Sequence, residues 1–172
     1  MIRRPPSSTH CPYPTLFRSQ HHDWQKLANG NLLVLANRLS KLPGFKLPES
    51  VEDVIYEVDP QGKVVWKWAA GEHLKEFGFT AEQLKLVKAT DHADFLHLNN
   101  LKQLGPNKWF DQGDARFHPD NLLIDSREAN CVAIIERKSG KVVWTLGPNY
   151  PELADPRSAR VPRPVDQLAG QH

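Results

Sequence analysis

The sequence has only two cysteines and no long apolar run. The first shortage argues against a disulfide-stabilised protein, and the second argues against a membrane-spanning helix. Cys11 lies in a terminal segment that is set aside below, so Cys131 has no partner for an internal disulfide. Because Cys131 lies in an apolar run of strand length, we interpret it as a buried free thiol rather than a nucleophile. No apolar run approaches the roughly 20 residues of a membrane-spanning helix, so no membrane span is expected.

The first 19 residues lack acidic side chains and any hydrophobic periodicity. Residues 12–19 closely resemble the translation of a common sequencing adapter, from which they differ at Pro14. The apolar stretch of a signal peptide does not follow Arg3 and Arg4. We therefore predict that residues 1–19 are a disordered artefact and leave them out of the fold prediction.

A strong excess of charge is also missing once that segment is removed. Arg3, Arg4 and Arg18 are three of the 22 basic residues, which leaves 19 against 20 acids and a formal net charge of −1. The rest of the chain contains no cluster of lysine and arginine, so we expect no nucleic-acid partner. With 40% hydrophobic and 24% charged residues, the chain has the composition of one domain with its own core.

What the sequence does contain is an internal repeat. Residues 62–66 and 140–144 both read Gly-Lys-Val-Val-Trp, and a β-type run that ends in a polar turn precedes each copy. Residues 27–34 align with residues 117–124 in the same way. Each copy therefore predicts two β-hairpins, with turns in the upstream pair at Asn29-Gly30 and Pro119-Asp120, and so four antiparallel strands per unit.

A histidine stands before the first strand of each unit, His22 in one and His97 in the other. His172 follows His97 by the same 75 residues that separate His97 from His22. The insertions within the two units differ in length, so the equal spacing of the histidines is partly a coincidence. The order of the elements is the observation that supports the prediction. That order places His172 where a third unit should begin.

Tandem four-stranded units are typical of a β-propeller, because each small sheet buries its faces against its neighbours. The sequence therefore predicts an all-β fold, a β-propeller fragment of about two four-stranded blades with a short helix in a connecting loop. We expect blade one at about 20–70, a connection at 71–93, blade two at about 94–147 and a tail at 148–172. A capping box at Thr80-Ala81-Glu82-Gln83 predicts that the helix begins at Ala81.

The motifs of both units, in their order, resemble those of the bacterial arylsulfate sulfotransferase family. The matching segments are residues 21–24 with 28–33, then 94–99, 122–130, 140–147 and finally 170–172. The resemblance implies a fragment of a six-bladed propeller that is periplasmic or exported. It also implies an enzyme that moves a sulfuryl group from a phenolic sulfate to a phenol without a nucleotide cofactor. Neither a metal nor another cofactor is expected.

The resemblance also implies roles for individual residues. His172 takes the place of the family's nucleophile, a neutral imidazole that forms a sulfohistidine intermediate. His22 and His97 match histidines that donate hydrogen bonds to the sulfate or shuttle the phenolic proton. Arg127 matches a sulfate-binding arginine. Strand alternation, rather than the resemblance, adds Asn99, which stands two residues past His97 on the same predicted strand face and is a second donor.

Other residues receive structural interpretations. His21 should point to the opposite face of the strand from His22. The insertion at 105–110 is expected to reshape the substrate mouth. We expect Trp66 and Trp144 to pack between blades. The remaining histidines of the two units match no motif and are interpreted as exposed loop residues: His73, His92 and His118.

Two other classes of function stay open. Residues 59–68 also resemble the repeat of pyrroloquinoline-quinone proteins, which would make the chain a non-catalytic or quinone-binding propeller. Those repeats are shorter and do not begin with a His-Asp or His-x-Asn motif. A third possibility is that the fold serves only as an adhesion or scaffold module. A bound quinone chromophore in the purified protein would favour the second class over sulfuryl transfer.

Two blades cannot close a ring, so we expect residues 20–172 to be part of a longer protein. As an isolated polypeptide they should be inactive and either unstable or self-associating, because blade faces and strand edges would be uncovered. Size-exclusion chromatography and a thermal melt check this expectation. A sharp two-state melt of a monomer would contradict it.

Overall fold

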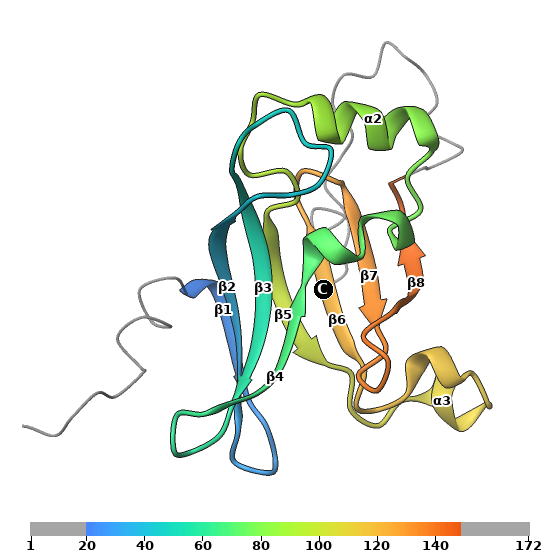
Figure 1. Cartoon of the computed structure of the whole chain (residues 1–172). Coiled ribbons are helices and arrows are strands. Elements are labelled where there is room, and N and C mark those ends of the chain that lie inside the picture. The colour runs from blue at the N-terminus through green and yellow to red at the C-terminus, as the bar shows by residue number, and fades with distance from the viewer. Residues whose placement is uncertain (1–19, 149–172) are drawn as a thin grey trace, which may run out of the picture.

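The computed structural model describes residues 20–148, which form two antiparallel β-sheets (Figure 1). Each sheet has four strands in chain order, so every strand pairs with its neighbour in sequence. The first sheet contains β1 (Gln20–Lys26), β2 (Leu32–Ser40), β3 (Ser50–Val58) and β4 (Val64–Ala69). The second contains β5 (Leu98–Gln103), β6 (Leu122–Ser126), β7 (Cys131–Ile135) and β8 (Val142–Leu146). The predicted all-β fold of two four-stranded units is therefore confirmed.

The β3–β4 hairpin shows how turn chemistry sets the strand register. The carboxylate of Asp59 accepts hydrogen bonds from the backbone N–H of Gln61 at 3.0 Å and of Lys63 at 2.8 Å. Gly62 has φ of +85°, a left-handed conformation that glycine adopts without a steric penalty. Gly140 holds the equivalent position before β8 with φ of +75°. The repeated Gly-Lys-Val-Val-Trp motif thus begins at the same kind of turn in both sheets.

The upstream hairpins differ between the two sheets. β1 and β2 are joined by a tight turn at Asn29-Gly30, as predicted. β5 and β6 also pair, but their connection holds α3 (Lys108–Asp111) and the 3-10 helix η3 (Ala115–Phe117). The predicted turn at Pro119-Asp120 is present, closed by the hydrogen bond from Asn121 N to the carbonyl oxygen of His118 at 2.9 Å, but it ends a long connection. Trp109 stacks on Phe117 with ring centroids 5.3 Å apart, so the inserted residues have a small cluster of their own.

The segment between the sheets contains the predicted helix, α2 (Ala81–Ala89), preceded by the 3-10 helices η1 (Ala70–Glu72) and η2 (Leu74–Glu76). The capping box is present: Thr80 Oγ1 accepts from Gln83 N at 3.2 Å, and Gln83 Oε1 accepts from Thr80 N at 2.9 Å. Leu84 and Val87 pack from α2 against the core. None of the helices in residues 20–148 is long and apolar enough to cross a membrane.

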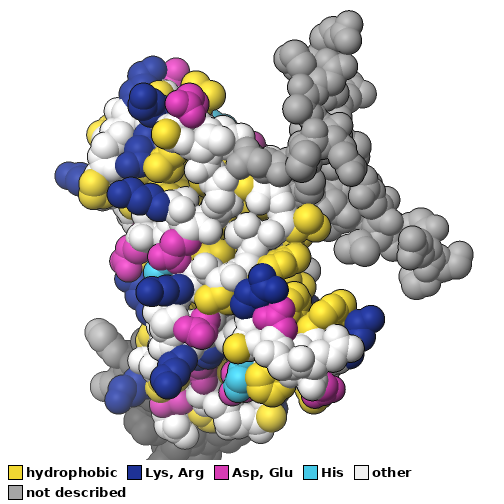
Figure 2. Space-filling model, turned by 90° about the vertical axis from the view of Figure 1, so that its right-hand side faces the viewer, with side chains coloured by type: hydrophobic (Ala, Val, Ile, Leu, Met, Phe, Trp, Pro, Cys, Tyr) yellow, Lys and Arg dark blue, Asp and Glu magenta, His cyan; other side chains and the backbone are white. Residues whose placement is uncertain are grey.

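One hydrophobic core is shared by the two sheets. Leu35 and Ile55 come from the first sheet, Leu101 and Ile124 from the second, and each is at most 1% exposed. Cys131 is buried and free, as predicted, and burial raises the pKa of its thiol to about 12. On the outside, Figure 2 shows side chains of both charges over one face, with apolar side chains between them.

Tryptophans hold the sheets together away from the inner strands. Trp66 of β4 lies under the Arg137 guanidinium, 3.6 Å from the ring centroid, which confirms a contact between the sheets. Trp144 of β8 differs from this, because its ring packs on Phe117 in the insertion of its own sheet, so its predicted packing between blades is not observed among the described residues. Trp68, which we had not singled out, is 3% exposed and donates its Nε1–H to the carbonyl oxygen of Gly140 at 2.8 Å.

Trp68→Ala should lower the free energy of unfolding by about 3–5 kcal/mol, because it leaves a large cavity and an unpaired carbonyl between the sheets. Chemical denaturation of the full-length protein measures this loss. The matched control is Trp109→Ala, since Trp109 is 49% exposed and its loss should cost less than about 1 kcal/mol. Equal losses for the two variants would contradict the assignment of Trp68 as a contact between sheets.

Candidate functional site

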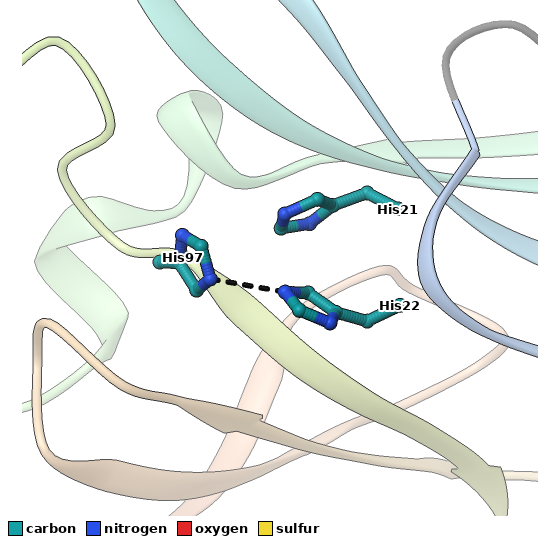
Figure 3. A group of neighbouring side chains, drawn as sticks. All are labelled: His21, His22 and His97. Atoms are coloured by element: carbon teal, nitrogen blue, oxygen red, sulfur yellow. Dashed lines mark hydrogen bonds between the residues drawn. The ribbon is translucent and has the colours of Figure 1, made fainter.

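Three histidines converge where β1 and β5 begin (Figure 3). His21 and His22 belong to β1, and His97 directly precedes β5. One ring nitrogen from each histidine lies within 4.8 Å of the others. His22 Nε2 and His97 Nε2 are 3.0 Å apart and share a hydrogen bond across the two sheets. The structure therefore brings His22 and His97 together, as their equivalent places in the repeat suggested.

The backbone at these two histidines is unusual. His22 has φ of +57° and His97 φ of +52°, in the left-handed region that residues with a Cβ rarely adopt. Each lies beside a register shift in the inner strand, between Gln20 and Trp24 in β1 and between Leu98 and Asn100 in β5. Such a conformation costs on the order of 1–3 kcal/mol and persists where the surroundings impose it. The same strain thus occurs at equivalent positions of the two sheets.

The register shift in β1 also corrects the prediction for His21. Strand alternation would turn His21 away from His22, but alternation fails at a bulge. The His21 ring instead meets the His22 ring edge-on at a centroid distance of 4.0 Å and the His97 ring at 4.7 Å. His21 is therefore a member of the cluster, and the prediction that it points to the opposite face is wrong.

Asp94 fixes the orientation of the His97 ring. Its Oδ2 lies 2.5 Å from His97 Nδ1. Since a carboxylate can only accept hydrogen bonds, Nδ1 of His97 carries the proton that is shared with Asp94. In neutral His97 the Nε2 atom is then the acceptor, and Nε2–H of His22 is the donor. The three residues form a continuous chain from a carboxylate to a solvent-exposed imidazole, in which His22 is the exposed end.

Asp53 of β3 lies beneath the cluster with a fully buried side chain. Its Oδ2 accepts from Leu98 N at 3.3 Å, and its Oδ1 lies 3.8 Å from His21 Nδ1. Burial raises the pKa of Asp53 to about 7. Burial also lowers the pKa of His21, and the neighbouring His22 and His97 lower it further. The lowered pKa keeps His21 neutral at neutral pH, so this contact is not an ion pair there.

Arg127 lies at the same end of the second sheet. It directly follows β6, and its backbone N–H donates to the carbonyl oxygen of His97 at 3.1 Å. Its guanidinium pairs with Glu128, with Nη2 2.7 Å from Oε1, and its side chain is 40% exposed. Glu128 had not been recognised as a competitor for this arginine. An anion at the cluster would have to draw the guanidinium away from Glu128.

Asn99 is the first residue within the irregular part of β5 and is half-buried. Asp125 of β6 lies beside this bulge and was missed by the sequence analysis. Burial raises the pKa of the Asp125 carboxyl, while hydrogen bonds from the backbone of Asn99 and Asn100 and the charge of His22 oppose that rise. The cluster is therefore backed by carboxyl groups from three places: Asp53, Asp94 and Asp125.

Other predicted site residues lie elsewhere. His172 falls outside the described residues. The insertion at 105–110 follows the far end of β5, so the prediction that it reshapes the mouth beside the histidines is wrong (Figure 1). His92 and His118 are exposed, as predicted. His73 is not an exposed loop residue, because its ring stacks on Trp68 at a centroid distance of 5.2 Å.

Two four-stranded antiparallel sheets in tandem, with histidines meeting where their inner strands begin, define a protein of the β-propeller class with an imidazole-rich site. The arylsulfotransferase (ASST) family model matches residues 10–166, so the chain belongs to the arylsulfotransferase family. Its general type of function is that of an arylsulfotransferase, with phenolic substrates. The matched range ends before Gly170-Gln171-His172. Comparisons with curated proteins and with solved structures give no match.

Asp53→Asn should make the protein more stable at high pH. Between about pH 4 and pH 7 the unfolded state loses the Asp53 proton while the folded state keeps it, so wild-type stability falls as the pH rises through this range. Asparagine removes that fall, which is at most about 4 kcal/mol at 1.36 kcal/mol per pH unit. Denaturant titrations of both proteins at pH 4 and pH 8 measure it.

The matched control for this substitution is Asp111→Asn, because Asp111 lies exposed on α3. The stability difference between Asp111→Asn and wild type should stay within about 0.5 kcal/mol at both pH values. If Asp53→Asn gained no stability relative to wild type between pH 4 and pH 8, the raised pKa of Asp53 would be refuted.

Proposed function

We propose that the protein transfers a sulfuryl group from a phenolic sulfate to a phenolic acceptor, through a sulfohistidine intermediate and without a nucleotide cofactor. Family membership supports the reaction class. The observation that carries the proposal is the chain from Asp94 through His97 to His22, which links a carboxylate to an exposed imidazole. In this scheme His172 is the nucleophile, on the strength of the Gly-Gln-His motif.

A proton is transferred in each of the two steps of the reaction, to the leaving group in the first and from the acceptor in the second. In the first, a ring nitrogen of His172 attacks sulfur, the bond from sulfur to the aryl oxygen breaks, and the departing phenolate takes a proton. In the second, the acceptor phenol oxygen attacks the same sulfur, the S–N bond breaks, and the phenolic proton is released. One imidazole that gives the first proton and receives the second balances both steps.

His97 is suited to that proton transfer. Its Nδ1 is held by Asp94, which fixes the ring orientation, and its Nε2 points at His22 (Figure 3). A carboxylate at Nδ1 stabilises the imidazolium. His97 enters the first step in this form and gives its Nε2 proton to the departing phenolate. The proton released by the acceptor phenol in the second step restores it. His22 is more exposed, and its Nε2–H can exchange the Nε2 atom of His97 for a sulfate oxygen as acceptor. We assign His97 to proton transfer and His22 to sulfate binding.

Positive charge is needed around the sulfuryl oxygens as the aryl bond breaks. Arg127 is the candidate, because its backbone N–H donates to the carbonyl oxygen of His97. Its partly exposed guanidinium can exchange Glu128 for the sulfate and bind two oxygens at once. Asn99 supplies a neutral donor from the adjacent bulge. We also propose a periplasmic or exported location, which the family resemblance implies.

Incubation of the full-length protein with 4-nitrophenyl sulfate should add one SO3 group to His172, detectable by peptide mass spectrometry. Because the intermediate is covalent, initial rates with donor and acceptor varied should follow ping-pong kinetics. His172→Ala should abolish the labelled peptide and lower kcat at least about a thousandfold.

The control for this experiment is His118→Ala, which removes an exposed histidine at the far end of the second sheet and should leave transfer unchanged. Full activity in His172→Ala, or a rate law that requires donor and acceptor to bind together, would overturn the sulfohistidine mechanism.

Arg127→Ala should raise the KM for the donor roughly tenfold or more, as expected when a charged hydrogen bond is lost.

A further inference from the structure

The histidine cluster has the donor set of a metal site. One ring nitrogen from each of the three histidines lies within 4.8 Å of the other two, so three imidazole nitrogens border a common space (Figure 3). Two nitrogens bound to one tetrahedral zinc ion lie about 3.3 Å apart, given Zn–N distances of roughly 2.0–2.1 Å. The Nε2 atoms of His22 and His97 are 3.0 Å apart, so the two rings need to move apart by only a few tenths of an ångström to bind the ion.

The surroundings of the cluster also resemble those of a metal site. Histidines that bind metals usually donate their second ring N–H to a carboxylate or a carbonyl, which fixes the ring. Asp94 is already in this position on His97. Asp53 Oδ1 faces His21 Nδ1 at 3.8 Å, and within the described part of the chain both atoms are buried without a hydrogen-bond partner. A small shift of the His21 ring would close this second pair and leave its Nε2 atom for a metal.

The donor type narrows the choice of ion. Three imidazoles and an open fourth position are the arrangement of zinc sites that retain an exchangeable ligand. Imidazole nitrogens suit zinc, copper and nickel, whereas calcium and magnesium require oxygen ligands. The exposure of His22 provides access from solvent. The hydrogen bonds from Asp94 to His97 and from His97 to His22 already place two of the donors side by side.

We propose that His21, His22 and His97 bind a divalent transition-metal ion of the zinc class, and that the bound ion excludes aryl sulfates. Coordination occupies Nε2 of His22 and of His97, which are the atoms assigned above to sulfate binding and proton transfer. Metal binding itself does not depend on that assignment. The competition with substrate rests on the proposed function.

Calorimetric titration of the full-length protein with Zn²⁺ should show one site. Replacement by Co²⁺ should give the strong visible absorption of a four-coordinate ion. His21→Ala removes one ligand and should weaken Zn²⁺ binding at least tenfold, while His118→Ala should bind like wild type. Asp94→Asn keeps all three ligands and should weaken binding about 10–100-fold through the lost partner of His97. Circular dichroism verifies that each variant is folded.

Unchanged affinity in His21→Ala would overturn the metal site, because it would show that zinc binds elsewhere. If His21→Ala does not fold, the Co²⁺ spectrum of the wild-type protein becomes the test. A spectrum without the absorption of a four-coordinate ion would then overturn the proposal. Transfer from 4-nitrophenyl sulfate should be inhibited by Zn²⁺ in wild type and relieved by a chelator, and His21→Ala should resist this inhibition. Zinc binding with undiminished transfer would overturn the competition alone. Zinc binding in a protein that never transfers sulfuryl groups would leave the site intact and refute the proposed function.

Discussion

The structure depends on the way β1 is attached to β5. The Asp23 carboxylate accepts from Leu101 N at 2.9 Å, and Gln25 Oε1 accepts from Gln103 N at 2.7 Å. These backbone groups face away from β6, at the edge of the second sheet, where an unpaired N–H is costly when it is buried. Side chains of one sheet thus complete the hydrogen bonding of the other. Because these strands carry the histidines at their beginnings, the same attachment sets His22 against His97.

Much of this architecture could be predicted from the sequence because it is encoded locally. Gly62 and Gly140 mark turns that only a few conformations satisfy, and Thr80 with Gln83 specifies the start of a helix within four residues. The pairing of His22 with His97 could be anticipated because equivalent positions of neighbouring repeats lie near one another. Asp94 was within reach as well, since it stands three residues before His97 in the motif that carried the resemblance.

What could not be predicted depends on backbone irregularities. His21 joins the cluster only because β1 has a bulge, and no single residue type marks this bulge as glycine would. Asp53 lies 31 positions from the nearest cluster member in sequence, His22, and reaches it through strand pairing. Buried carboxyls such as Asp53 conflict with the rule that cores are apolar. Conflicts of this kind are expected at functional sites, where chemistry is favoured over stability.

The hydrogen bond between His22 and His97 has a consequence for how such a site can change. Its two halves lie on separate repeats, so neither sheet holds a working set of imidazoles by itself, and loosening of the contact between the sheets would dismantle the site before either sheet unfolds. The two histidines also differ in their surroundings. His97 contacts the carboxylate of Asp94, while His22 is exposed to solvent. Equivalent positions of the two repeats thus hold histidines with the same left-handed backbone but different chemical surroundings, so the symmetry of the fold does not extend to the chemistry of the site.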